Sequence, residues 1–191
     1  MKLSPDGKPL LLADHSALDL VNTVSRIEGK DFDFWSDDED VESWLERVGL
    51  SVDSVNVHWS RGELLSHAKE LRSLVLSWLH KSREEGEILN VLNSYLAESW
   101  SHPKVIYESS TGLRVERRRS AMSVKGLLGP ISESVADLIA NGDPQRIGQC
   151  QHNECILWFY DRTKARRRRW CSMALCGNRH KVGEYRKRHG S

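Results

Sequence analysis

Residues 150–179 read CQHNECILWFYDRTKARRRRWCSMALCGNR and contain every cysteine of this 191-residue chain. Cys150 and Cys155 form one pair, Cys171 and Cys176 a second, and four residues separate the members of each pair. Two short cysteine pairs on either side of a loop are typical of a structural zinc site with four thiolate ligands. We therefore expect these four residues to bind Zn2+. Disulfides or incidental free thiols are the alternative.

A site of four cysteines leaves the metal without the open coordination position that a catalytic zinc keeps. We therefore expect no enzymatic activity. A zinc-scaffolded nuclease would need a second site, for which His180 and Asp161 are candidates, but their spacing does not favour one. His152, His180 and His189 are rival ligands. We expect them outside the coordination shell, because four sulfurs complete a tetrahedron.

The cysteines lie in a C-terminal segment, residues 146–191, which is near the ~40-residue size below which a domain usually needs a metal or disulfides to fold. The run 156–160 predicts a strand, and 163–169 predict a return loop with a second strand. Ser172 is expected to cap a helix that carries the last ligand. A knuckle, a hairpin and a helix describe a treble-clef-like finger.

Charge is distributed unevenly along the chain. Residues 146–191 hold 12 Lys/Arg and 3 Asp/Glu, a net charge of +9, whereas the rest of the chain has a net charge of −8. A basic module at the end of an acidic chain predicts an anionic partner, and duplex DNA is the leading one. The alternative is that the basic segment docks on the acidic part of the same chain.

Eleven basic side chains are candidate nucleic-acid contacts. Those expected on the hairpin loop are Arg162, Lys164, Arg166, Arg167, Arg168 and Arg169; those expected on the terminal helix are Arg179, Lys181, Arg186, Lys187 and Arg188. On the helix, partners seven residues apart share a face. Asn178 and Arg179 lie beside a cysteine, so bracing of the finger and contact with DNA are both open for them.

The first 145 residues are mostly helical in pattern. Apolar residues at helical spacing, capping-box pairs and turn residues predict helices at 16–25, 36–48, 60–78, 87–98 and 130–141. The runs 104–108 and 113–117 predict a β-hairpin. The fold class is therefore α+β: an acidic, mostly helical domain at 1–143 with a hairpin, followed by the basic finger at 144–191.

Two features of the first domain have both a structural and a ligand-binding interpretation. Five tryptophans there could enclose a pocket for a small-molecule effector, although a core of large residues is the simpler explanation. Asp19 and Asn22 share a helix face. We expect them to hydrogen-bond backbone groups nearby or at an inter-domain contact rather than to bind a ligand.

The C-terminal segment resembles the CGNR zinc finger. The resemblance rests on 158–162 (WFYDR), 169–173 (RWCSM) and 176–179 (CGNR), and the four cysteines match the ligand positions of that family. Residues 15–23 (HSALDLVNT) resemble the opening motif of the ABATE domain, which accompanies this finger. The resemblance implies a stress-induced transcription regulator whose zinc-bound module binds DNA.

The sequence thus favours a DNA-binding regulator whose first domain senses a signal or forms a homodimer. The alternatives are an RNA-binding or ribosome-associated zinc module, which would stack bases on the aromatic residues at 158–160, and a protein-interaction module. The apolar run 10–13 is too short for a signal peptide or a membrane span. We therefore expect a cytoplasmic protein without a membrane partner.

Overall fold

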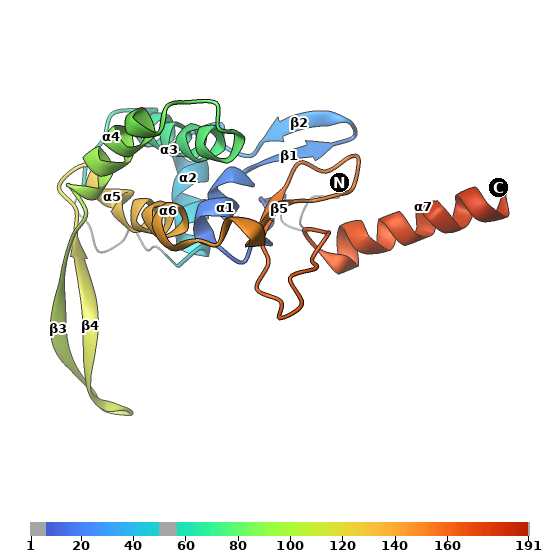
Figure 1. The fold of residues 1–191 in the computed structure, drawn as a ribbon. Helices are drawn as coiled ribbons and strands as arrows, with labels where there is room; N and C mark the ends of the chain where they lie inside the picture. The colour runs from blue at the N-terminus through green and yellow to red at the C-terminus, as the bar shows by residue number, and fades with distance from the viewer. Residues whose placement is uncertain (1–6, 50–56, 191) are drawn as a thin grey trace. The chain divides into compact units, whose positions relative to one another are not determined.

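The computed structural model describes residues 7–49 and 57–190 (Figure 1). The chain divides into two compact units, one of residues 37–136 and one that joins residues 1–36 to residues 137–191. The sequence-based division at 143/144 remains a prediction about successive segments of the chain. In space, the first 36 residues group with the C-terminal segment.

The unit of residues 37–136 is built from helices and one long hairpin. Its elements are α2 (Asp38–Arg47), α3 (Glu63–His80), α4 (Glu85–Leu96), β3 (Trp100–Glu108), β4 (Gly112–Ser120), α5 (Val124–Leu127) and the first part of α6 (Gly129–Asn141). The predicted apolar stripe of α3 is buried at Leu64, Ala68, Leu71 and Val75. Burial of such a stripe is the main source of stability for a helix of this kind.

The N-terminus of α2 connects this helix to α3. Asp37 caps α2 by accepting a hydrogen bond from the backbone N–H of Asp40 at 3.0 Å. The carboxylate of Asp38 accepts bonds from the N–H groups of Gly62 and Leu65 at 2.6 and 2.8 Å. Orphan N–H groups at the start of α3 are thereby satisfied from the neighbouring helix.

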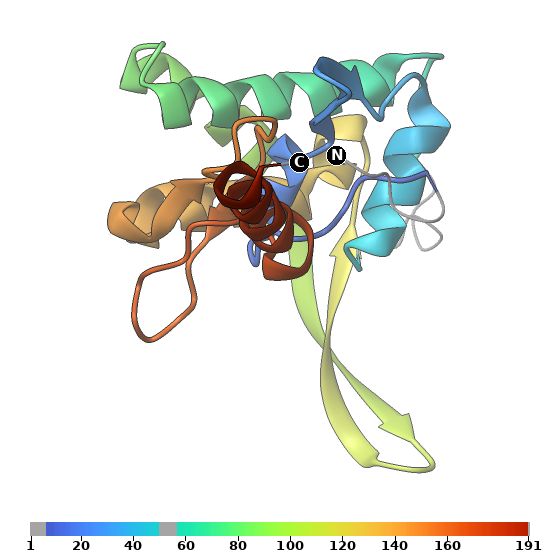
Figure 2. The same ribbon diagram turned by 90° about the vertical axis from the view of Figure 1, so that its right-hand side faces the viewer.

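The predicted hairpin is confirmed and is longer than expected. β3 and β4 pair antiparallel from Trp100↔Ser120 to Glu108↔Gly112, nine residues on each strand. Gly112 has φ of +79°, a conformation that favours glycine at the end of the turn. Figure 2 shows the two strands coiling about each other, which is the usual twist of a two-stranded ribbon.

The other unit contains the cysteines. Its elements are α1 (Ser16–Val21), β1 (Val24–Ile27), β2 (Lys30–Asp33), the end of α6, the 3-10 turn η1 (Pro144–Arg146), β5 (Ile147–Gln149), β6 (Trp158–Tyr160), the π-helical turn η2 (Met173–Gly177) and α7 (Asn178–His189). β1 pairs with β2, and β5 pairs with β6. α1 lies against β6.

Two details of the sequence-based secondary structure are wrong. The first helix ends at Val21 rather than Ser25, because 24–27 pair with 30–33 across a turn in which Glu28 and Gly29 have positive φ. The strand predicted within 163–169 is a loop. The carboxylate of Asp161 accepts bonds from the N–H groups of Thr163 and Arg168, both at 2.8 Å, and closes that loop. The partner of β6 is β5, which precedes the first cysteine.

The α+β class is confirmed by this mixture of helices and small hairpins. Trp35 and Trp44 are buried core residues, whereas Trp100 is 71% exposed. Trp59 lines an open, acidic hollow of about 450 Å3, so the tryptophans do not gather around one pocket. Among the described helices, none combines the length and the apolar composition needed to cross a membrane.

Candidate metal centre and nucleic-acid interface

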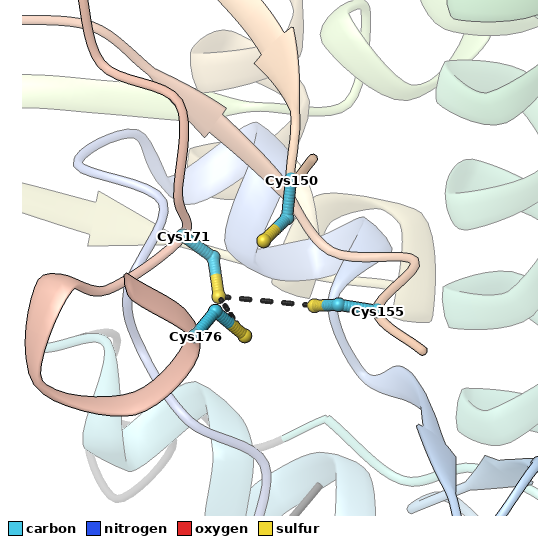
Figure 3. A group of neighbouring side chains, drawn as sticks. All are labelled: Cys150, Cys155, Cys171 and Cys176. Carbon is cyan, nitrogen blue, oxygen red and sulfur yellow. Dashed lines mark hydrogen bonds between the residues drawn. The ribbon is translucent and has the colours of Figure 1, made fainter. Parts of the chain in front are cut away.

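The four cysteines predicted as ligands meet at one point (Figure 3). All four are buried, and their sulfurs all lie within 4.8 Å of one another. The sulfur of Cys171 lies 3.8 Å from that of Cys155 and 3.6 Å from that of Cys176. A tetrahedral ion with metal–sulfur bonds of about 2.3 Å places its sulfurs about 3.8 Å apart. The group therefore has the geometry to hold one metal ion, and these separations are far above the length of a disulfide bond.

Local backbone structure brings the sulfurs together. The N–H of Cys150 donates to Leu157 O, and that of Cys155 donates to His152 O, both at 2.9 Å, which forms the first knuckle. Ser172 caps the second, because its hydroxyl accepts the N–H of Leu175 at 3.3 Å. The cap predicted at Ser172 is confirmed, and the helix that continues as α7 starts from the cysteine cluster.

The chemistry of the cluster calls for a cation. Hydrogen bonds from Cys155, Cys171 and Cys176 lower the pKa of Cys150, and the pKa of Cys155 is lowered as well. Hydrogen bonding to Cys150 raises the pKa of Cys171 and of Cys176. Four thiolates at this separation repel one another strongly in a buried site. Only a bound cation would allow all four to ionise together.

The nearby histidines are placed outside the sulfur cluster. The Nδ1 atom of His152 accepts the backbone N–H of Glu154 at 3.2 Å, which organises the first knuckle. The ring of His180 lies 4.7 Å from that of Trp170, and His189 stacks on Tyr185 at 4.2 Å. Within the described residues, the potential metal-binding group consists of the four cysteines alone.

Residues from the beginning of the chain complete this centre. Asn22 forms two 2.8 Å hydrogen bonds with the backbone of Trp158, one to its C=O and one from its N–H. The N–H of Tyr160 donates to Ala13 O at 2.7 Å, and Leu12 packs against the cysteine cluster. The backbone-binding interpretation of Asn22 is confirmed. The sequence showed a polar residue on an apolar helix, but not that its partner lies 136 residues away.

Asp19 holds the N-terminal segment in place. Its Oδ1 atom accepts the N–H groups of Leu12 and Ala13 at 2.9 and 3.0 Å. Burial raises the pKa of Asp19 to about 6, although these two hydrogen bonds oppose the rise. Asp19 thus binds backbone, as the sequence favoured.

Arg168 is a structural residue, although its position in the basic run suggested a nucleic-acid contact. Its guanidinium donates to the backbone oxygens of Leu12, Tyr160, Trp170 and Cys171, and it forms an ion pair with Asp14. The side chain is 17% exposed, and its charge lies 4.5 Å from the centre of the Phe159 ring. These contacts join the N-terminal segment to the chain around Cys171, so Arg168 is not available to bind phosphate.

The other basic residues of the loop are only partly committed. Arg162 donates to Asp14 O at 2.8 Å, Arg166 pairs with Asp143 at 3.1 Å, and Arg169 donates to Gln151 at 2.6 Å. Lys164 and Arg167 are exposed. The surface of the loop therefore carries some basic side chains that bind other protein groups and others that are exposed to solvent.

α7 carries the remaining candidates and contains no buried residue. Arg179 lies at its start, 3.9 Å from Glu154, which favours a bracing role, and Asn178 is exposed. Lys187 pairs with Glu184 at 3.1 Å. Lys181, Arg186 and Arg188 are exposed. α7 is a straight helix in Figure 1 and begins two residues after Cys176, so the cysteine cluster anchors the N-terminal end of this basic helix.

Two family models match the chain. One, described as "CGNR zinc finger", matches residues 146–189, and the other, ABATE, described as "Putative stress-induced transcription regulator", matches residues 14–142. No curated protein matches the chain. Both matches agree with the motifs at the two ends of the sequence. The chain belongs to the ABATE family, and a CGNR zinc finger forms its C-terminal part.

Proposed function

We propose that this protein is a DNA-binding regulator of transcription whose C-terminal finger, held by one zinc ion, docks on duplex DNA. The observation that carries the proposal is the joining of a four-cysteine cluster to a basic helix with no buried residue. A metal at the base of the helix would fix where its cations point. The first domain would then either sense a signal, such as a small-molecule effector, or form a homodimer.

Zinc fits the donor set best among common metals. Four thiolates in a tetrahedron suit zinc, whereas oxygen-rich octahedral sites suit magnesium or calcium. Zinc supplies cross-linking energy and no redox chemistry, so the site would be structural rather than catalytic. The expected content is one zinc ion per chain by mass spectrometry of the metal. A Cys171→Ser variant that retained a full equivalent of zinc would contradict the assignment.

Phosphate contact is best supported for the exposed, uncommitted cations. These are Lys164, Arg167, Lys181, Arg186 and Arg188. If all five neutralise phosphates, the logarithm of the binding constant should fall by about 4.5 units for each tenfold rise in salt. A stacking role for the residues of β6 is less well supported, because Phe159 is buried and its two neighbours are half-buried.

The test is the affinity of the zinc-loaded protein for a duplex of about 30 base pairs, measured by fluorescence anisotropy over a range of salt concentrations. The variant Lys181→Gln/Arg186→Gln should reduce the salt slope by about 1.8, because two phosphate contacts are lost. Arg83→Gln, which removes an exposed charge between α3 and α4, is a control that should leave the slope unchanged. A double variant with the wild-type slope would refute α7 as the DNA-binding element.

A further inference from the structure

The β3–β4 ribbon has one apolar face. In the register of the hairpin, Val105 lies opposite Val115 and Tyr107 opposite Leu113, which places four large apolar side chains on the same face. Their exposed fractions are 64%, 70%, 75% and 74%, respectively. Scattered exposed apolar residues are normal, but four in two adjacent rows form a contiguous patch.

The opposite face of the ribbon carries Trp100 and Ile106 but is otherwise polar, and several of its charged side chains pair with one another. Arg114 lies 3.4 Å from Glu108 and 3.7 Å from Glu116, and Arg118 lies 3.0 Å from Glu116. Such a network is stable in water without a partner. The contiguous exposed apolar surface of the ribbon therefore lies on the face of Val105, Tyr107, Leu113 and Val115.

An isolated two-stranded ribbon is at best marginally stable in water. This one has nine residues on each strand and leaves its apolar side chains exposed over the half nearest the turn. A contact that buried this face would stabilise the ribbon and remove an aggregation hazard.

We propose that the apolar face of the ribbon is the interface of a homodimer, covered by the same face of a second copy of this chain. The four side chains expose roughly 500 Å2 on each copy, so two copies would bury about 1,000 Å2, the lower bound for a specific interface. A two-fold axis crossing the ribbons would pack each Tyr107–Leu113 row on the Val105–Val115 row of the second copy. Such a self-facing contact is the usual form of a dimer.

The chemistry of the patch favours this occupant over a nucleic acid. The four side chains carry no charge, so two copies can meet without repulsion and without unpaired buried ions. Phosphate would require free cations on the same face. Of the two arginines nearer the base of this face, Arg119 is paired with Glu133 through two bonds of 2.9 and 2.8 Å. Arg117 donates to the neutral Ser101 at 2.8 Å, so it is a single exposed cation beside four apolar side chains.

The test is sedimentation equilibrium of the full-length, zinc-loaded protein without DNA, at roughly 1–50 µM. Wild type should be a dimer, and Leu113→Glu should weaken association by at least about 100-fold, because each copy would lose one buried leucine and gain a charge. Trp100→Glu is the matched control. Trp100 is also large, apolar and 71% exposed, but it lies on the polar face, so its variant should dimerise like wild type.

Each outcome decides the proposal. A monomeric wild type at 50 µM overturns it, and so does a Leu113→Glu variant that dimerises normally or a Trp100→Glu variant that does not. Far-UV circular dichroism would verify that both variants are folded, which their exposed positions lead us to expect. Because no DNA is present, a failure here is distinguishable from a failure of DNA binding.

Discussion

Replacing Asn22 by alanine tests whether the N-terminal segment is part of the finger. The Asn22 side chain is 2% exposed and forms one hydrogen bond to the C=O of Trp158 and one from its N–H, each of 2.8 Å. Trp158 begins β6, the strand between the two cysteine pairs. The substitution therefore removes both bonds at the point where the two segments meet.

The two bonds and the small cavity left by the amide should together cost about 2–3 kcal/mol. In a domain of this size, that loss lowers Tm by roughly 5–10 °C. Because metal binding and folding are coupled in small zinc modules, a looser scaffold should also release its metal faster. Aspartate at position 22 would lose the donor and place a buried carboxylate beside the C=O of Trp158, so we expect Asn22→Asp to destabilise the fold at least as much as Asn22→Ala.

The assay is zinc transfer to a chromogenic chelator, followed by absorbance and paired with thermal unfolding by circular dichroism. Asn90→Ala removes an exposed asparagine from α4 and is the control for a general effect of the substitution. If Asn22→Ala released zinc at the wild-type rate and unfolded at the wild-type temperature, the N-terminal segment would not support the metal centre. The reasoning from these contacts would then be wrong.

Three further predictions follow from the same contacts. The fragment 144–191 with equimolar zinc should bind the metal but show poor chemical-shift dispersion by NMR, because Leu12, Ala13 and Asn22 are missing; a well-dispersed spectrum would contradict this. Arg168→Gln should lower the free energy of unfolding by about 3 kcal/mol in urea titrations, and it should leave the salt slope of DNA binding unchanged, because its donors serve backbone oxygens. Asp19 has a folded-state pKa raised to about 6, so its protonated form favours folding below its ordinary value of 3.8, and that contribution is lost as pH rises through 6. The side-chain oxygen of Asp19→Asn can still accept both N–H groups, so in urea titrations at pH 8 its free energy of unfolding should exceed that of wild type by about 1–3 kcal/mol. Equal free energies of unfolding at pH 8 would refute the raised pKa.

Local features of this chain were readable from residue pattern. The apolar stripe of α3, the hairpin at 100–120, the cap at Ser172 and the grouping of the four cysteines each follow from spacing over a few turns or one loop. Such features depend on residues close together in the sequence, whose spacing sets the local backbone geometry.

The sequence did not predict which distant residues these local elements contact. The strand paired with β6 comes from before Cys150 rather than from 163–169, because Asp161 closes a loop where a strand was expected. Arg168 looked like its three basic neighbours in the sequence, yet its environment makes it a structural residue. The residue type alone could not distinguish Arg168 from its neighbours. Whether an arginine side chain is exposed or hydrogen-bonded depends on which carbonyl groups lie around it in the folded chain.

The sequence by itself determined the α+β class, the four cysteines that could hold a metal ion and the concentration of positive charge at the C-terminal end. Only the tertiary structure decided that residues 12–22 support the segment that carries the cysteines, through Leu12, Ala13 and Asn22. The reason is physical: cysteine spacing and charge are written along the chain, whereas a hydrogen bond between residues 136 positions apart exists only after folding.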